Sequence, residues 1–328
     1  MRGIKAKDGS YNCGVIRAGT PSPAPRLKFA GATFERKVDL RQFCSPVFDQ
    51  LKIGSCCAAS LCGALEFLSI KNNQAKHTLS PMFLFYNARK MSDSTQQIAG
   101  TMAAHASAAV MAFGVCDENL WPYREDTARE QPPQDAYQAA TKFEAVKYAR
   151  LGSTDEVKAT LSGGLPVMFA SDIGMGYYDT AARTGRMPDL NAIEGGRPCS
   201  HAMLIVGYDE DDKSWLVRNS WGEQFGERGY LRIPYALFNR HVWNDEMWVI
   251  GGLEDPRGEM RLEGSPQEAV AYVEKHGADD MREALTKLGK EIGEDLQKRT
   301  DDAKTSIRDR LRKQEDELAA KRKKPGEH

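Results

Sequence analysis

The spacing of apolar residues follows a helical period in the first half of the chain. It predicts helices over residues 56–70, 81–88 and 101–113. Flanking residues support these ends, because serine caps helix N-termini, proline is tolerated in a first turn and glycine commonly follows the last turn. The residues concerned are Ser55, Pro81 and Gly114.

The second half changes to short apolar or alternating runs bounded by turn residues, which is the pattern of β-strands. These runs cover residues 165–170, 202–206, 214–218, 229–233 and 247–250. A helical half followed by a sheet half is an α+β arrangement. We therefore predict two lobes, one helical and one built on strands, with the cleft between them as the natural place for a site.

Three regions of the chain differ in composition and in the periodicity of their apolar residues. Residues 1–38 carry a Pro/Ser/Gly stretch at 19–25 and little periodicity, which predicts an extended N-terminal arm. Residues 39–252 hold nearly all the aromatic side chains and the compact apolar runs, so they form the predicted globular body. Residues 253–328 are dominated by charge, and we predict a helical or partly disordered tail.

Apolar residues recur at helical spacing within this tail. They are Met281, Leu285, Leu288, Ile292, Leu296, Ala303, Ile307, Leu311 and Leu318, with a period of about 3.7 residues. One interpretation is a coiled-coil or docking helix that binds a partner or a second copy of the chain. The alternative is a solvated helix, because Gly289 and Gly293 interrupt the stripe. The equal mixture of acidic and basic residues disfavours a helix lying on a membrane.

Charge and hydropathy exclude several classes of protein. Lys plus Arg number 45 and Asp plus Glu number 46, so a net charge of −1 gives no support for nucleic-acid binding. No apolar run approaches the roughly 18–20 residues of a membrane span. The basic residues 1–8 precede no apolar stretch, unlike a secretory signal. We expect no membrane span, and a protein that is cytoplasmic or exported by a route independent of a signal peptide.

Seven cysteines stand at positions 13, 44, 56, 57, 62, 116 and 199. Their odd count and uneven spacing do not indicate a disulfide framework, and a reducing compartment is the simpler interpretation. Cys56 and Cys57 are adjacent, but no second close pair completes a four-ligand zinc site. We expect no metal, and one of these cysteines is then a candidate for chemistry.

Cys56 stands at the expected first turn of a helix, where the partial positive charge of the N-terminus lowers a thiol pKa. By itself such a cysteine is more often a small buried residue. His201 opens a later apolar run and Asn219 follows another. A Cys on a helix N-terminus, a His on a strand and an Asn beyond a neighbouring strand is the arrangement of an activated thiolate.

At these residues the body resembles the papain family of cysteine peptidases. The matching segments are Gln50 with Gly54-Ser55-Cys56 and Ala58, Phe113-Gly114, Trp121-Pro122-Tyr123, Gly163 with Leu165-Pro166-Val167, Ser200-His201-Ala202 with Val206-Gly207-Tyr208, and Asn219-Ser220-Trp221-Gly222 with Gly226 and Gly229-Tyr230. The resemblance covers about residues 38–252. It implies a two-lobed papain-like fold with a helical left lobe and an antiparallel, β-barrel-like right lobe.

The resemblance also implies a role for each matching residue. Cys56 is the expected nucleophile, His201 its proton acceptor, and Asn219 the residue that orients the imidazole under the cover of Trp221. Gln50 and the Cys56 backbone N–H are expected to stabilise the oxyanion. Neither a metal nor an organic cofactor is needed. The expected substrate is a peptide or protein, and the substrate-binding positions that align are Gly100, Thr101, Ala170, Cys199, Ala202 and Trp221.

The chain departs from the family pattern at three places. Cys57 replaces the tryptophan that usually follows the nucleophile, and Ile53 stands where a half-disulfide is usual, as in disulfide-poor bacterial members. Only Gly100 remains of the double-glycine segment that pairs with the substrate backbone. The N-terminal arm is shorter than the usual pro-domain. It is either an abbreviated pro-segment that blocks the cleft of a zymogen or a flexible terminus.

Three function classes remain open at this level. A cysteine endopeptidase is favoured because Cys56, His201, Asn219 and Gln50 are all present. A thiol acyl-transfer or deamidating enzyme, such as an effector or toxin, uses the same triad chemistry. A non-catalytic binding module that keeps the fold has no need of the complete set of residues. Sequence alone does not separate the first two.

Overall fold

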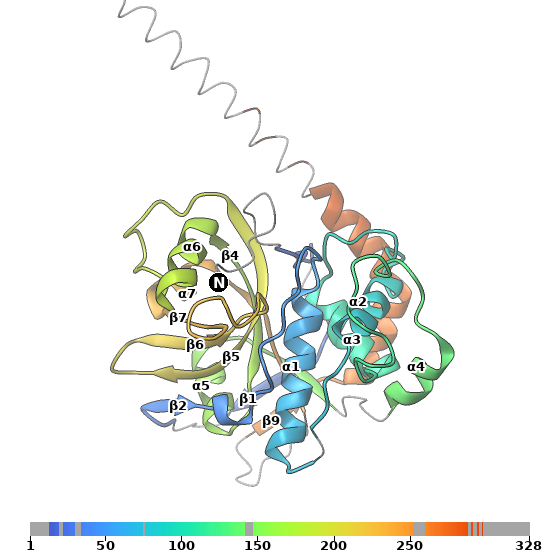
Figure 1. Cartoon of the computed structure of the whole chain (residues 1–328), viewed down its shortest axis with the longest axis horizontal. Coiled ribbons are helices and arrows are strands. Elements are labelled where there is room, and N and C mark those ends of the chain that lie inside the picture. The colour runs from blue at the N-terminus through green and yellow to red at the C-terminus, as the bar shows by residue number, and fades with distance from the viewer. Residues whose placement is uncertain are drawn as a thin grey trace, which may run out of the picture. The chain divides into compact units, whose positions relative to one another are not determined.

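A computed structural model of the chain describes residues 13–19, 22–29, 34–74, 76–141, 147–251, 260–287, 290, 294 and 297. The long helices come from the first half of the body and the sheet is built mainly from the second half, as Figure 1 shows. The α+β class predicted from the change of period is therefore confirmed.

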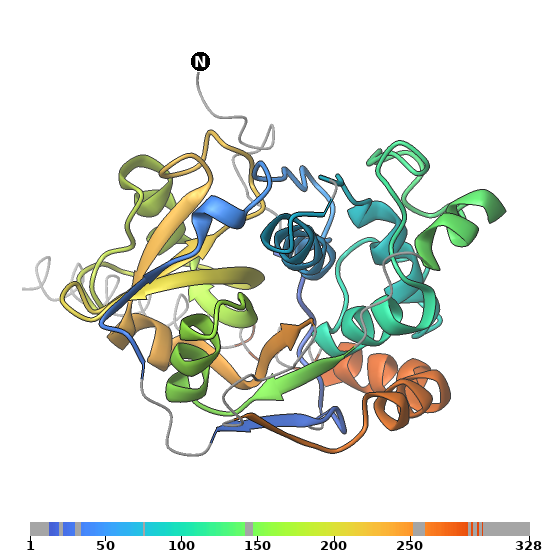
Figure 2. The ribbon, with the colours of Figure 1, turned by 90° about the horizontal axis from the view of Figure 1, so that it is seen from below.

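Helix α1 (Cys56–Lys71) is the central element, and it lies between the sheet on one side and the other long helices on the other (Figures 1 and 2). Nearly all of its residues are buried, so it lacks the polar face of a surface helix. Small side chains permit close packing around it. A Cβ at Gly63 would lie 1.9 Å from Nη1 of Arg218, so a side chain at this position would displace the guanidinium.

Helices α2 (Pro81–Lys90), α3 (Ala103–Phe113) and α4 (Gln134–Ala140) complete the helical side. The Ser80 Oγ accepts the Phe83 N–H at 3.1 Å, which is an N-cap, and proline occupies the first turn as predicted. α3 ends at Gly114, whose φ of 66° is readily accessible to glycine. The sequence placed these two ends correctly because each depends on local backbone chemistry.

The sheet is mixed and open over the described strands, with the order β7-β6-β5-β4-β8-β3-β1-β9 and β2 paired to β5. All pairings are antiparallel except the one between β1 and β3. The strands are β1 (Arg26–Phe29), β2 (Lys37–Asp39), β3 (Tyr148–Leu151), β4 (Val167–Gly174), β5 (Pro198–Asp209), β6 (Ser214–Arg218), β7 (Tyr230–Pro234), β8 (Val242–Ile250) and β9 (Met260–Glu263).

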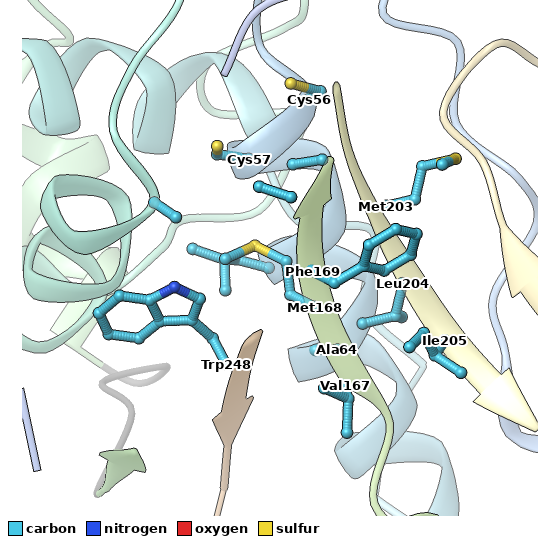
Figure 3. Packing of buried hydrophobic residues seen from close by; sticks show 14 of the residues in the cluster. Cys56, Cys57, Ala64, Val167, Met168, Phe169, Met203, Leu204, Ile205 and Trp248 are labelled. Atoms are coloured by element: carbon cyan, nitrogen blue, oxygen red, sulfur yellow. The ribbon is translucent and has the colours of Figure 1, made fainter. Parts of the chain in front are cut away.

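Shorter helices connect these strands: η1 (Arg41–Phe43), α5 (Thr154–Ser162), α6 (Met175–Thr184) and α7 (Tyr235–His241). The hydrophobic core continues from α1 into β4 and β5. Figure 3 shows Ala64 of α1 in this packing with Phe169 of β4 and Leu204 of β5. Burial of this apolar surface fixes the helix against the sheet.

The N-terminal region enters the sheet. β1 pairs with both β3 and β9, and Leu27 within it is buried. An abbreviated pro-segment that blocks the cleft does not do so through Leu27 and Phe29, because both belong to a strand in the sheet. Residues that do approach the predicted site lie earlier, at Gly14–Ile16.

A helix over residues 266–287 follows β9 and is coloured orange in Figure 1. Ala269, Val273 and Met281 are buried, and a Cβ at Gly277 would lie 2.5 Å from the Met91 carbonyl oxygen. One compact unit reaches to Met281 and a second begins at Arg282. The predicted boundaries at residues 38/39 and 252/253 stay predictions.

Most of the predicted apolar stripe, from Leu288 to Leu318, lies outside the described residues. Binding of a partner or of a second copy through this stripe therefore stays a prediction. None of the helices in the described ranges combines the length and apolar character that crossing a bilayer requires.

Candidate active site

Cys56 is the first residue of α1, with its Sγ at the N-terminal end of the helix (Figure 3). Ser55 occupies the N-cap position but its side chain does not cap the helix. Its Oγ instead lies 2.6 Å from the Tyr123 phenol oxygen. The N-terminal backbone N–H groups of α1 therefore surround the thiol with partial positive charge that a side-chain cap does not neutralise.

His201 and Asn219 come together because β5 and β6 are paired. Leu204 lies opposite Arg218 across this pair, so Asn219, the residue after β6, comes within two positions of His201 along β5. The two side chains are 2.8 Å apart between His201 Nε2 and Asn219 Oδ1. Both residues are buried, at 0% and 3% exposure.

The hydrogen bonds of Asn219 fix the protonation of the neutral imidazole. Its Oδ1 also accepts the Ser220 N–H at 2.8 Å, which identifies this atom as the amide oxygen. An oxygen acceptor requires a donor at His201 Nε2. The other ring nitrogen, Nδ1, is then the one with a lone pair for a proton, and it makes no hydrogen bond to oxygen or nitrogen among the described residues.

Aromatic side chains enclose the imidazole. The Trp221 ring stacks on His201 with centroids 4.6 Å apart and planes inclined by 19°. Tyr178 meets His201 edge-on at 5.9 Å and contacts Trp221 at 5.0 Å. These rings exclude water from the His201–Asn219 hydrogen bond, which strengthens it in the low-dielectric interior.

The thiol of Cys56 is set up to ionise. Burial raises its pKa, but hydrogen bonds from Cys57 and His201 and the charge of His201 outweigh burial and hold the pKa well below its ordinary value. The neighbouring Cys57 behaves in the opposite way. Its hydrogen bond to Cys56 and its burial raise the pKa of the Cys57 thiol well above the ordinary value. Ionisation therefore resides on Cys56, with Cys57 as a neutral donor.

Gln50 lies in the loop that leads to the nucleophile and is completely buried. Its Oε1 accepts a 2.6 Å hydrogen bond from Ser220 Oγ, and its Nε2 donates to the Ile53 carbonyl oxygen at 2.9 Å. The backbone N–H of Gln50 donates to the Ser220 carbonyl oxygen as well. Ser220 thus connects Gln50 directly to the loop that carries Asn219.

The predicted substrate-binding residues lie on both sides of this group. Gly100 and Thr101 precede α3 on the helical side. Ala170 of β4 pairs with Ala202 of β5, and both are buried. Trp221 covers the imidazole as described above. The thiol of Cys57 contacts the Thr101 carbonyl oxygen at 3.8 Å, so the residue that replaces the usual tryptophan packs toward this segment.

The N-terminal arm bridges these two sides. Ile16 N–H donates to the Thr101 carbonyl oxygen at 2.9 Å, and Thr101 N–H donates to that of Gly14 at 3.0 Å. Val15 N–H donates to the carbonyl oxygen of Ser200 at 3.2 Å, immediately before His201. With the arm in place, neither Cys56 nor His201 has any exposed surface.

Cys199 corrects the expectation of a chain without disulfides. It is bonded to Cys13 of the arm, with Cα atoms 5.3 Å apart. The two residues are 186 positions apart in the sequence and meet only because the arm lies along β5. The predicted wall of the second subsite therefore includes half of a disulfide. Cys44, Cys56, Cys57, Cys62 and Cys116 are free thiols.

Tyr123 is a functional candidate that the sequence argument did not single out. Its hydroxyl contacts Ser55 and donates to the Gln50 carbonyl oxygen at 2.8 Å. The signal was present in the Trp121-Pro122-Tyr123 motif, but the motif alone does not show which residues the phenol reaches. Within the described ranges, no group of three or more His, Cys, Asp and Glu side chains is placed to hold a metal ion.

Comparison with known proteins shows what the whole chain is similar to. Xylellain, a cysteine protease from Xylella fastidiosa, has a similar structure, with a TM-score of 0.64, 26% sequence identity and coverage of 75% of this chain and 99% of that one. An uncharacterized peptidase C1-like protein of Acanthamoeba polyphaga mimivirus is 31% identical over 63% of this chain and 70% of its own length. Human cathepsin L2 is 29% identical over 60% of each chain.

The papain-like architecture expected from the motifs is confirmed by the similarity to the xylellain structure, although the sheet is open over the described strands and not a closed barrel. The family model of the papain family cysteine proteases matches residues 34–245 of the chain. This range contains Gln50, Cys56, His201 and Asn219. The chain therefore belongs to the papain family of cysteine proteases.

Proposed function

We propose that the chain is an endopeptidase that cleaves peptide bonds through Cys56, His201 and Asn219. The observation that carries this proposal is the 2.8 Å contact from His201 Nε2 to Asn219 Oδ1, in which the amide orientation leaves Nδ1 as the proton acceptor beside a thiol of lowered pKa. An ionised thiol next to an oriented imidazole is the nucleophile–base pair of thiol hydrolysis.

The reaction follows in two stages. The Cys56 thiolate attacks the scissile carbonyl, and the developing oxyanion accepts hydrogen bonds from the Gln50 amide and the Cys56 backbone N–H. Protonated His201 donates to the leaving amine as the tetrahedral intermediate collapses to a thioester. His201 then takes a proton from water, which attacks the thioester and releases the acid. Asn219 keeps the ring in one orientation throughout.

We also propose that the chain is a zymogen whose N-terminal segment covers the site. The support is that Gly14–Ile16 hydrogen-bond to Thr101 on one side and to Ser200 on the other, while Cys56 has no exposed surface. A tethered segment has an effective concentration in about the millimolar range, so weak contacts suffice for inhibition.

The catalytic proposal is tested with the full chain in a dithiol buffer. An epoxide thiol inhibitor should label Cys56 in the wild type, and a panel of dipeptide amides should be hydrolysed. Cys56→Ala should lose both properties, whereas Cys57→Ala, the matched neighbour, should keep its labelling at Cys56. Labelling at Cys57 would show that the wrong thiol was chosen. Release of ammonia from glutamine peptides without chain cleavage would favour deamidation instead.

The covering role of the arm is tested by Gly14→Ala. A Cβ at this position would lie 2.3 Å from the Gly54 Cα, so the arm cannot keep its path. Residues that bind or cleave substrate are unchanged. We expect faster epoxide labelling than in wild type under the same conditions. Gly163→Ala, where the nearest contact is 3.3 Å, is the matched control. Equal labelling rates in all three proteins would show that the arm does not block the site and is only a terminal segment.

A further inference from the structure

A disulfide bond links the N-terminal arm to the body, and it lies beside the site. Cys13 immediately precedes the bridging residues Gly14–Ile16, and its partner Cys199 stands two residues before His201. Ser200, between them, accepts the Val15 N–H through its carbonyl oxygen. The disulfide and the hydrogen bonds therefore hold the same short stretch of arm.

We propose that the Cys13–Cys199 disulfide is a thiol-exchange site at which a dithiol reductant releases the arm and so activates the protein. This inference rests on the proposed function, because it assigns a trigger to the covering segment. With the disulfide intact, the arm is attached to the body both at Cys13 and through β1. Without the disulfide, it is attached only through β1.

The attachment of the arm explains why this bond is decisive. Downstream, β1 begins at Arg26 and is held in the sheet between β3 and β9. Upstream, the disulfide fixes the arm at Cys13. With both ends fixed, the stretch between them has little freedom to leave the site. Once the disulfide is broken, only non-covalent contacts oppose dissociation of Gly14–Ile16: the backbone hydrogen bonds to Thr101 and Ser200 and the burial of Val15 and Ile16. Each hydrogen bond contributes little once water can replace it, and the released chain gains conformational entropy.

Exposure identifies the sulfur at which exchange begins. Cys13 is partly exposed, whereas Cys199 is completely buried. An incoming thiolate therefore attacks Cys13 Sγ, and the S–S bond breaks with its electron pair on Cys199, which takes up a proton. The second thiol of the reductant then attacks the mixed disulfide and releases Cys13 as a thiolate that is protonated in turn. The reductant is oxidised to a disulfide, and the protein gains two electrons and two protons.

Exchange at this bond also alters the predicted second subsite. Cys199 pairs with Ile173 across β5 and β4, close to Ala170 and Ala202. In the oxidised state Cys13 is attached to that wall. After reduction Cys199 presents only a small thiol, and Cys13 leaves with the arm. The same event thus uncovers the nucleophile and vacates one wall of the pocket.

The test compares three full-length proteins purified without reductant: wild type, Cys13→Ser and Cys44→Ser. Cys44 is a partly buried free thiol outside the site, so its substitution is a matched control. Each protein is incubated with and without dithiothreitol, the excess is removed, and the rate of epoxide labelling is measured. Peptide mapping without reduction reports the Cys13–Cys199 cross-link in parallel.

We expect wild type and Cys44→Ser to label slowly until the cross-link disappears, and then faster by roughly 10-fold or more, the scale on which loss of a tether weakens binding. Cys13→Ser should label at the fast rate without any reductant. A Cys13→Ser protein as slow as oxidised wild type would overturn the proposal, and so would rapid labelling of wild type that still carries the cross-link.

A second measurement does not depend on the reactivity of Cys56. Arg17 is exposed and follows the bridging residues, with its guanidinium 5.2 Å from the centre of the Trp243 ring. Release of the arm should increase the rate of tryptic cleavage after Arg17 in reduced wild type and in Cys13→Ser. An unchanged rate would refute the thiol-exchange site. Failure of every protein to label, together with faster cleavage, would instead refute the proposed function and retain the exchange site.

Discussion

The hydroxyl of Tyr123 donates a 2.8 Å hydrogen bond to the backbone carbonyl of Gln50. Its single proton is used in this bond, so Ser55 Oγ, at 2.6 Å, must be the donor in the second contact. Tyr123 therefore joins the residue that carries the amide donor to the residue immediately before Cys56. One phenol thus contacts both ends of the loop that carries the two proposed oxyanion donors.

The surroundings keep this phenol in place. The Phe48 ring meets it edge-on at 4.7 Å, and the Tyr123 N–H donates to Glu118 Oε1 at 2.6 Å. Burial raises the pKa of Glu118 to about 7, although the Tyr123 N–H acts against this rise. These contacts therefore hold Tyr123 against the loop from Gln50 to Cys56.

We predict that Tyr123→Phe lowers kcat by up to roughly 10-fold and leaves KM unchanged, because loss of one hydrogen bond loosens donors that act mainly in the transition state. Steady-state kinetics on a dipeptide amide give both constants. Tyr137→Phe removes a 2.8 Å hydrogen bond to Asn87 Oδ1 outside the site and serves as the matched control. A lower melting temperature with an unaltered kcat would show that Tyr123 is only structural.

We predict that Asn219→Ala is less severe than His201→Ala. Asn219 orients the imidazole, whereas His201 transfers the protons and cannot be bypassed. The measurement is kcat/KM for both variants beside Cys56→Ala, which should match His201→Ala. Asn219→Ala should also alter the pH profile, since the ring can then turn. An Asn219→Ala protein as inactive as the cysteine variant would contradict a purely orienting role.

The predicted second subsite should accept bulky apolar or aromatic side chains. Its aligned walls at Ala170, Cys199 and Ala202 are small and uncharged, which leaves room and offers no charged partner. We expect the highest kcat/KM for dipeptide amides with Leu or Phe at the position that enters this subsite, measured on reduced protein. Ala170→Leu should shift the preference toward smaller side chains. A strong preference for an acidic residue would refute this mapping.

Stability should fall as pH rises through the range in which Glu246 titrates. Burial raises the pKa of Glu246 from 4.5 to about 7, so the folded state retains a proton that the unfolded chain has already lost. The contribution is complete below pH 4.5 and is lost by about pH 7, a difference of about 3 kcal/mol.

The variant Glu246→Gln tests this pH dependence. It keeps an acceptor for the Trp248 Nε1–H, which now bonds Glu246 Oε2 at 2.7 Å. We expect Glu246→Gln to be more stable than wild type at pH 8 and similar to it at pH 4, as measured by urea unfolding. Glu223→Gln, at an exposed position, is the control. If the free energy of unfolding of Glu246→Gln differed from that of wild type by the same amount at both pH values, the buried carboxyl would not be the source of the pH dependence.

The helices of the first half were predictable because their ends depend on nearby residues. Ser80 caps its own helix and Gly114 ends another, and both effects arise within a single turn. The strands were predictable for a similar reason, since β6 contains a short apolar run bounded by turn residues. Their partners were not predictable. Pairing of β1 with β3 joins residues more than a hundred positions apart, which no local pattern encodes.

For the site, the sequence by itself determined which residue types are available and in what order, and from these the papain family followed. The tertiary structure alone decided how they meet. It placed Asn219 2.8 Å from His201, connected Tyr123 to Gln50, and brought Cys13 to Cys199. The physical reason is that each contact depends on sheet register and on packing around α1, which sum over the whole chain.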